Sequence, residues 1–298
     1  MGHHHNHSEF QSSKKLYMAV FINLVLTLFQ IVGGILSGSL SLLADALHNF
    51  SDAGALIIAA VAARIAKIPP NQKMTYGYKR AEILGALINS TTLVIVGFYL
   101  IYEAVLRYLN PSTIDGWTVV IVATVALVID LMTALLTFSG AKNSMNIKAA
   151  FIHNISDAAA SLVVIVSGVL IILYKIYLVD LIATILVAIY VLVHAFILIR
   201  RCILILMQST PEHLNVATVK SAIEAIQWVK EAYHIHIWQL DDNRIFLEGH
   251  IVIAEEHLNL LEQIKANIRQ ILHETYSISH TTLELETKKV PGPLSVRT

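Results

Sequence analysis

The chain carries six long apolar segments in its first two thirds, and these limit the folds open to it more than any other feature. Each segment is near or above the about 20 residues that an α-helix needs to cross the apolar core of a bilayer. Of the 298 residues, 56% are hydrophobic and 14% are charged, and the mean hydropathy is +0.65. The predicted membrane helices cover residues 16–38, 40–66, 81–108, 117–141, 147–174 and 177–207. We therefore predict an α-helical membrane domain over residues 16–207, with lipid as its main solvent and no nucleic-acid partner.

The short connections between these segments predict how the chain is oriented. The first segment follows Lys14 and Lys15, exceeds the roughly 7 to 15 residues of a signal-peptide core and has no small-residue cleavage site, so we expect a retained helix. One set of alternate connections collects most of the Lys and Arg residues, whereas the other contains only Arg107 and Lys175. Because basic residues concentrate on the cytoplasmic side, both termini are predicted to be cytoplasmic.

The composition changes after the sixth segment. From residue 208 to the end, 8 Lys or Arg residues stand against 12 Asp or Glu residues, which gives a net charge of −4. Alternation of polar and apolar residues predicts strands. The expected order is a helix over 212–227, strands over 233–240 and 244–253, a helix over 255–275 and a strand over 281–286. This order predicts a small cytoplasmic α+β domain over residues 208–287, followed by a tail over 288–298.

A short polar motif occurs twice inside the apolar segments. The hexapeptide His-Asn-x-Ser-Asp-Ala begins at His48 and again at His153, so that Asp52 and Asp157 each follow a histidine by one helical turn. Four nitrogen and oxygen ligands suit the tetrahedral preference of Zn²⁺, and a single cysteine, Cys202, excludes a multi-thiolate site. Each pair could instead be a hydrogen bond that orients helices. Ionisable residues in a membrane span are costly and mark ion pathways by default, so the repeat favours a metal site.

The sequence around these motifs resembles a known family. The block Gly-Ser-Leu-Ser-Leu-Leu-Ala-Asp-Ala over 38–46 leads into the first motif, and Thr-Tyr-Gly-Tyr-Lys-Arg-Ala-Glu-Ile-Leu-Gly-Ala over 75–86 follows it. With both motifs, these blocks resemble the cation diffusion facilitators, in particular their bacterial cobalt-zinc-cadmium-resistance branch. The resemblance covers nearly the whole chain. It implies a homodimer of six-span protomers with a metallochaperone-like cytoplasmic domain, which exports Zn²⁺ in exchange for protons.

The resemblance also implies where metals bind. In that family the transported ion is held at the positions of His48, Asp52, His153 and Asp157. Two histidines with two aspartates are associated with zinc preference, whereas members with an aspartate in place of the first histidine accept Cd²⁺ more readily. Co²⁺ is a further expected cargo.

A second metal site is predicted in the cytoplasmic domain, where Zn²⁺ would be a regulatory ligand. Relatives with such sites have ligands at the positions of His250, His257 and Glu286, and this chain adds His234 and His236 nearby. At one further position those relatives have a histidine, whereas this chain has Tyr233.

Two aspartates and the N-terminus leave alternatives open. Asp45 lies one turn before His48 and could either hydrogen-bond that imidazole or pair near the membrane boundary. Asp130, alone in the fourth segment, fits a proton relay and an interhelical hydrogen bond equally well. The His-rich tail over 1–15 is either a metal-gathering segment or part of an expression tag. Many eukaryotic relatives have their His-rich stretch between the fourth and fifth spans, where this chain is short, so we expect a bacterial inner membrane.

The expected mechanism is alternating access, in which neutral histidines and ionised aspartates bind the cation and protonation on the other side expels it. Histidine suits this exchange because its ordinary pKa of about 6.5 lies near physiological pH. An intramembrane zinc metalloenzyme is the main alternative, but four protein ligands would leave no open position for water. A membrane-tethered metal sensor is a third possibility. No enzyme activity and no organic cofactor are expected.

Overall fold

A computed structural model describes residues 24–141 and 145–288, apart from the side chains of residues 56, 136, 137, 139–150 and 153. The chain divides into two compact units. One comprises Met1–Ala60 with Ile88–Ile199, and the other comprises Val61–Leu87 with Arg200–Thr298. The sequence-based domain boundaries, including that between residues 207 and 208, stay predictions.

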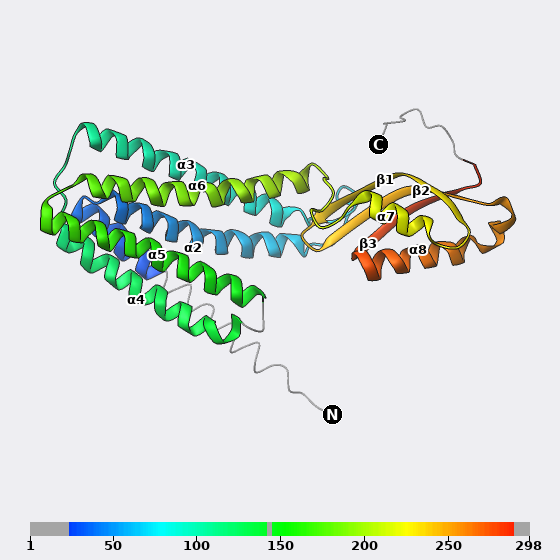
Figure 1. Ribbon diagram of the computed structural model, residues 1–298, viewed down its shortest axis with the longest axis horizontal. Helices are drawn as coiled ribbons and strands as arrows, with labels where there is room; N and C mark the ends of the chain where they lie inside the picture. The colour runs from blue at the N-terminus through cyan, green and yellow to red at the C-terminus, as the bar shows by residue number, and fades with distance from the viewer. Residues whose placement is uncertain (1–23, 142–144, 289–298) are drawn as a thin grey trace, which may run out of the picture. The chain divides into compact units, whose positions relative to one another are not determined.

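Five helices in the described chain are long and apolar enough to cross a membrane. They are α2 (Leu40–Ala66), α3 (Ala81–Leu109), α4 (Gly116–Ala141), α5 (Met145–Tyr174) and α6 (Leu178–Leu206), and Figure 1 shows them running lengthwise beside one another. A shorter apolar helix, Leu24–Ser37, precedes them. Five predicted spans are therefore confirmed within a few residues, while the first, 16–38, begins outside the described residues.

Side chains in the helical unit are distributed in the opposite way to those of a water-soluble protein. Large apolar side chains point outward, with Ile95 65% exposed and Leu135 74% exposed, whereas Asp45 and Gln30 are fully buried. Close packing between helices relies on small residues, since a Cβ atom at Gly97 would lie 2.8 Å from the side chain of Leu192. Polar interiors and small contact residues are typical of helices packed in lipid.

The carboxylate of Asp180, in the first turn of α6, fastens the start of α2. It accepts hydrogen bonds from the hydroxyl groups of Ser39 (2.5 Å) and Ser41 (2.6 Å) and from the backbone N–H of Leu40 (2.8 Å). A helix N-terminus has unsatisfied N–H groups and a partial positive charge, both of which favour a carboxylate there. Because Asp180 is fully buried, water cannot replace it. Asp180 of α6 therefore fixes the position of α2 along its axis.

The turn that precedes α2 is held from two other helices. Gly38 has a φ of +71°, which favours glycine, and its carbonyl oxygen accepts a hydrogen bond from Nη1 of Arg107 in the last turn of α3. The backbone N–H of Asp115, just before α4, donates to the carbonyl of Ser37 at 2.9 Å. This end of the helical unit is thus a fixed junction of several helices.

The second unit contains the predicted α+β fold. Its elements are α7 (Val216–Glu224), β1 (Val229–Asp241), β2 (Arg244–Ile253), a 3₁₀-helix (Glu255–Leu260), α8 (Leu261–Tyr276) and β3 (Ile278–Glu286). The strands form one sheet in the order β1-β2-β3, antiparallel between β1 and β2 and parallel between β2 and β3. A parallel pair needs a crossover connection, which α8 supplies.

One apolar core joins both helices to the sheet. Val219 and Ile223 of α7 and Ile268 of α8 pack with Leu247 and Ile251 of β2, all nearly inaccessible. This core lies wholly within the C-terminal part of the chain. The C-terminal segment therefore has the buried apolar surface that independent folding needs.

The structure corrects three details of the predicted secondary structure. The helix expected from residue 212 starts later, because Asn215 caps it by accepting the N–H groups of Ala217 (2.8 Å) and Thr218 (3.3 Å). The helix expected over 255–275 begins as a 3₁₀ turn. The alternation expected in β1 is interrupted, because its pairing register with β2 shifts between Tyr233 and His236. His234, which lies between them, has a φ of +52°.

The junction before α2 leads to a testable prediction. Asp180→Ala should lower the midpoint of thermal unfolding of the full-length protein in detergent, because several buried donors lose their acceptor at a cost of about 2 to 4 kcal/mol. Asp115→Ala is the matched control. Asp115 also begins a helix, accepting the N–H of Trp117 (3.1 Å) and the hydroxyl of Thr118 (2.6 Å), but it is exposed. Water can replace it, so we expect a loss of about 1 kcal/mol or less. Equal shifts in the two variants would contradict this assignment.

Candidate functional site

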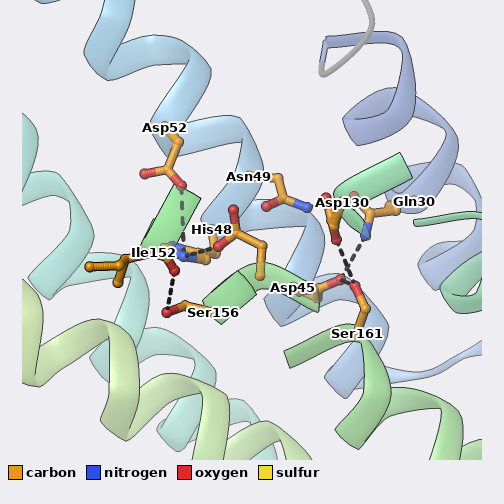
Figure 2. A network of polar contacts seen from close by, with 10 residues as sticks. Gln30, Asp45, His48, Asn49, Asp52, Asp130, Ile152, Ser156 and Ser161 are labelled. Carbon is orange, nitrogen blue, oxygen red and sulfur yellow. Dashed lines mark hydrogen bonds and ion pairs between the residues drawn. The ribbon is translucent and has the colours of Figure 1, made fainter. Parts of the chain in front are cut away.

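The two copies of the repeated motif lie on α2 and α5, and the structure brings parts of both together. Nε2 of His48 lies 3.7 Å from Oδ2 of Asp52 on its own helix and 3.5 Å from Oδ1 of Asp157 on α5. His48 is 9% exposed and Asp157 is 6% exposed. Ligand-type atoms of the three residues all lie within 4.8 Å of one another. Figure 2 shows His48 and Asp52 facing each other at this point.

The fourth residue predicted from the motif is His153. Its backbone belongs to α5, one turn before Asp157, but its side chain lies outside the part of the chain whose side chains are described. Its participation therefore stays a prediction that rests on the helical period.

The three described side chains form a compact set of one nitrogen and two oxygen donors. Such donors bind a divalent cation when the carboxylates are ionised and the imidazole is neutral. The same imidazole can instead take a proton, and it would then form ion pairs with the two carboxylates. Burial among apolar helices strengthens either interaction because the surroundings screen charge poorly. A proton on His48 and a cation at the same nitrogen exclude each other.

An aromatic side chain of α6 packs against this cluster. The ring of Tyr190 meets that of His48 edge-on at a centroid distance of 5.9 Å, and it meets that of His194 at 4.6 Å. The sequence analysis did not identify Tyr190, because an aromatic residue in an apolar helix carries no signal of its own.

A second polar group lies beside the first, on α2 and α5 together with α4 and the helix Leu24–Ser37. Oδ2 of Asp45 accepts from Nε2 of Gln30 at 2.6 Å and lies 3.3 Å from Oγ of Ser161, which also lies 3.3 Å from Oδ2 of Asp130. Asn49 donates to Oε1 of Gln30 at 2.9 Å. Figure 2 shows the side chains of Gln30, Asp45, Asp130 and Ser161 pointing toward one another.

This arrangement answers part of the question about the two aspartates. The described hydrogen bonds of Asp45 go to Gln30 and Ser161 rather than to His48, so its support of that imidazole stays a prediction. Asp130 does form the interhelical contact that was one of its two predicted roles. Gln30 and Ser161 were missed, although a glutamine inside an apolar span was an available signal.

In the second unit, neighbouring strands assemble a second cluster. Nδ1 of His250 on β2 lies 2.9 Å from Oε1 of Glu286 and 3.6 Å from Oε2 of Glu284, both on β3. Ligand-type atoms of these three residues also lie within 4.8 Å of one another. The sequence analysis named His250 and Glu286, and the parallel register adds Glu284 directly opposite His250.

Two of the other predicted cytoplasmic ligands lie near His250, and a third does not. The ring of His234 stacks on that of His250 at 5.5 Å and contacts that of His236 at 4.8 Å, so both lie near the cluster. His257 lies on the 3₁₀-helix against Trp228 and is not grouped with His250 among the described residues. The hydroxyl of Tyr233 donates to Glu286.

Comparisons with known proteins agree with this architecture. Residues 16–207 match the model of the cation efflux transmembrane domain, and residues 211–288 match that of the cytoplasmic domain of cation efflux proteins. Only three residues separate the two matches.

Individual relatives extend over almost the full chain. A "cadmium, cobalt and zinc/H(+)-K(+) antiporter" of Bacillus subtilis is 34% identical over 97% of this chain and 93% of its own length. The zinc transporter ZitB of Pectobacterium atrosepticum is 32% identical over 96% and 89%, and the metal cation efflux system protein CzcD of Cupriavidus metallidurans is 32% identical over 96% and 90%. Among solved structures, the metal-bound C-terminal domain of a CzcD transporter from C. metallidurans is 27% identical over 24% of this chain and 99% of that chain, with a TM-score of 0.23.

Proposed function

The chain belongs to the cation efflux family of membrane transporters, and from this premise we propose that it exports Zn²⁺ in exchange for protons through the cluster on α2 and α5. Membership confirms the prediction of a transporter over that of an enzyme. Two relatives, a zinc transporter and an antiporter of cadmium, cobalt and zinc, support Zn²⁺ as a cargo, with Cd²⁺ and Co²⁺ as related ones.

The observation that carries the proposal is the position of His48 between two carboxylates inside the membrane helices. Asp52 belongs to the same helix and Asp157 to another, so a relative movement of α2 and α5 changes the distance between the ligands. His153, one helical turn before Asp157, is the proposed fourth ligand, and it would complete a set of two nitrogens and two oxygens. This is the set that suits Zn²⁺ at a site without cysteine.

Proton exchange follows from the chemistry of the same atoms. A cation binds the neutral imidazole and the ionised carboxylates, so loading the site releases the protons that these groups hold. When the helices open the site to the other side, protonation of His48 and the carboxylates weakens the ligands and the cation leaves. The direction of exchange then depends on the pH difference together with the difference in cation concentration.

The proposal is tested with purified protein in liposomes. An imposed pH difference should move Zn²⁺ across the membrane, with protons moving in the opposite direction. If neither flux occurs in folded protein, the proposed transport is wrong, and a metal-sensing role for the two clusters becomes the better explanation.

The first variant removes one carboxylate from the cluster. Asp157→Ala should reduce Zn²⁺ flux to the level of empty liposomes, because the site loses one ligand and one negative charge that offsets the dication. Ser156→Ala is the matched control, since the hydroxyl of this neighbouring residue donates to the carbonyl of Ile152 on the same helix at 3.0 Å. Near-normal flux in Asp157→Ala would refute the role of this carboxylate.

The second variant changes the donor atoms. His48→Asp keeps the number of ligands but replaces a nitrogen by an oxygen, and by the family resemblance it should admit Cd²⁺ more readily. In a competition assay with both ions, the ratio of Cd²⁺ flux to Zn²⁺ flux should rise in His48→Asp. The same ratio should stay unchanged in the control Ser156→Ala. An unaltered ratio in His48→Asp would count against His48 as a ligand.

The surroundings of the protein are part of the proposal. We place it in a bacterial inner membrane with both termini in the cytoplasm, on the distribution of basic residues, and as a homodimer, on the match of its C-terminal part to the cytoplasmic domain of the family. Zn²⁺ bound at the cytoplasmic cluster would regulate transport, provided that it binds one arrangement of the protomers more tightly than another.

The regulatory site predicts metal binding by the isolated C-terminal fragment over residues 209–298. Its apolar core is contained in this fragment, so the fragment should fold and bind Zn²⁺ in a calorimetric titration. His250→Ala should weaken that binding at least about tenfold, because the other two members of the cluster are carboxylates. His273→Ala, which removes an exposed histidine of α8, should leave it unchanged. Equal Zn²⁺ affinities of the two variants would contradict the proposed cytoplasmic site, and they would say nothing against the membrane site.

A further inference from the structure

The contact between Asp45, Ser161 and Asp130 contains one hydrogen too few. Oγ of Ser161 lies 3.3 Å from Oδ2 of each aspartate, and both are hydrogen-bonding distances. A hydroxyl group has a single hydrogen and can donate it to only one of them. The second contact is a hydrogen bond only if that aspartate carries a proton and donates it to the serine oxygen. Otherwise, two buried carboxylates would face one hydroxyl with only one bond between them, at a high cost.

Neighbouring donors indicate which aspartate carries the proton. Oδ2 of Asp45 also accepts from the amide of Gln30 at 2.6 Å, so this oxygen acts as an acceptor and has no hydrogen to donate to Ser161. Ser161 then donates to Asp45, and the bond to Asp130 must run from a protonated Asp130 to Ser161. Asp130 is only 6% exposed on the apolar helix α4, where a neutral carboxyl group costs less than a charged one. Figure 2 shows the carboxyl group of Asp130 beside Ser161.

Several groups connect Asp130 to the metal cluster. Asp45 and His48 of α2 and Asp157 of α5 interact with it electrostatically, and the uncharged Oγ of Ser161 on α5 lies 3.3 Å from its Oδ2. His48 follows Asp45 by three residues, and Ser161 follows Asp157 by four, so adjacent turns of the same two helices carry both clusters. A dication at the metal cluster therefore acts on Asp130 electrostatically, in apolar surroundings that screen charge poorly.

We infer that Asp130 holds a proton that is exchanged for the transported cation, an inference that rests on the proposed antiport. Binding of the dication favours the ionised carboxylate, so Asp130 loses its proton to water and becomes an aspartate anion. Departure of the cation restores the carboxyl group by uptake of one proton. By linkage, a proton on Asp130 weakens cation binding by the same factor by which the cation weakens proton binding. Asp130 thus couples the two fluxes without being a metal ligand.

The test counts the protons released when Zn²⁺ binds to the purified full-length protein. Calorimetric titrations in buffers with different enthalpies of protonation give this number. Asp130→Asn keeps the shape of the side chain and can donate an N–H to Ser161, but it has no proton to release. Its count should fall by about one proton for each Zn²⁺ bound at the membrane site. Asp115→Asn, at the exposed start of the same helix, is the matched control and should keep the full count.

Contributions from histidines elsewhere in the chain cancel in the comparison between variants. An equal count in Asp130→Asn and the unsubstituted protein overturns the inference and leaves the proposed transport intact. If the unsubstituted protein binds no Zn²⁺, the proposed function fails and this inference falls with it.

A second measurement covers the case in which Asp130→Asn does not fold. Infrared difference spectra of the unsubstituted protein should show that Zn²⁺ binding removes a carbonyl band of a protonated carboxyl group, and that the band shifts in D₂O. Where Asp130→Asn folds, the band should be missing from its spectra. Failure of Zn²⁺ to remove any such band from the unsubstituted protein overturns the inference.

Discussion

The structure depends on the free-energy cost of placing charged side chains in apolar surroundings. An ionised side chain in a membrane helix costs several kcal/mol unless other groups compensate it. The described helices meet this constraint in three ways. Asp180 is compensated by hydroxyl and N–H donors at the start of a helix, Asp45 by an amide and a hydroxyl, and Asp157 by an imidazole that lies between it and Asp52. Only the third arrangement can exchange one compensating charge for another, because an imidazole can give up its proton to make room for a cation.

Helix α2 links these three arrangements along its length. Its first turn is held by Asp180, its second carries Asp45, and the next carry His48 and Asp52. Because the first turn is fastened at a junction with other helices, displacement of α2 is constrained at one end more than along its middle. A tilt about that end would change the distance from His48 to Asp157 while leaving Asp180 in place. In the proposed alternating access, a relative movement of α2 and α5 would change the cation site in this way.

Local patterns in the sequence predicted much of this and missed what depends on distant pairing. The two motifs identified His48, Asp52 and Asp157, since one helical turn separates the members of each pair. Strand 244–253 was predicted correctly because the polar turn before it and the alternation within it are local. Ser161 and Gln30 meet Asp45 only through the packing of separate helices, which no local pattern encodes. Glu284 was likewise revealed by the parallel register of β2 and β3, whereas His257 matched a family position but lies against Trp228.

The two clusters use similar donor atoms in surroundings that give them different properties. The side chains of His48 and Asp157 in the membrane cluster are 10% and 8% exposed, whereas those of His250 and Glu284 in the cytoplasmic cluster are 28% and 69% exposed. Water and salt screen the exposed carboxylate, so its attraction for a cation falls as ionic strength rises. The buried carboxylates keep their attraction, but they must be neutralised by a proton or a cation at every stage. If both clusters bind metal as proposed, the electrostatics of the membrane cluster favour exchange, whereas the cytoplasmic cluster would be empty or filled according to the concentration of metal around it.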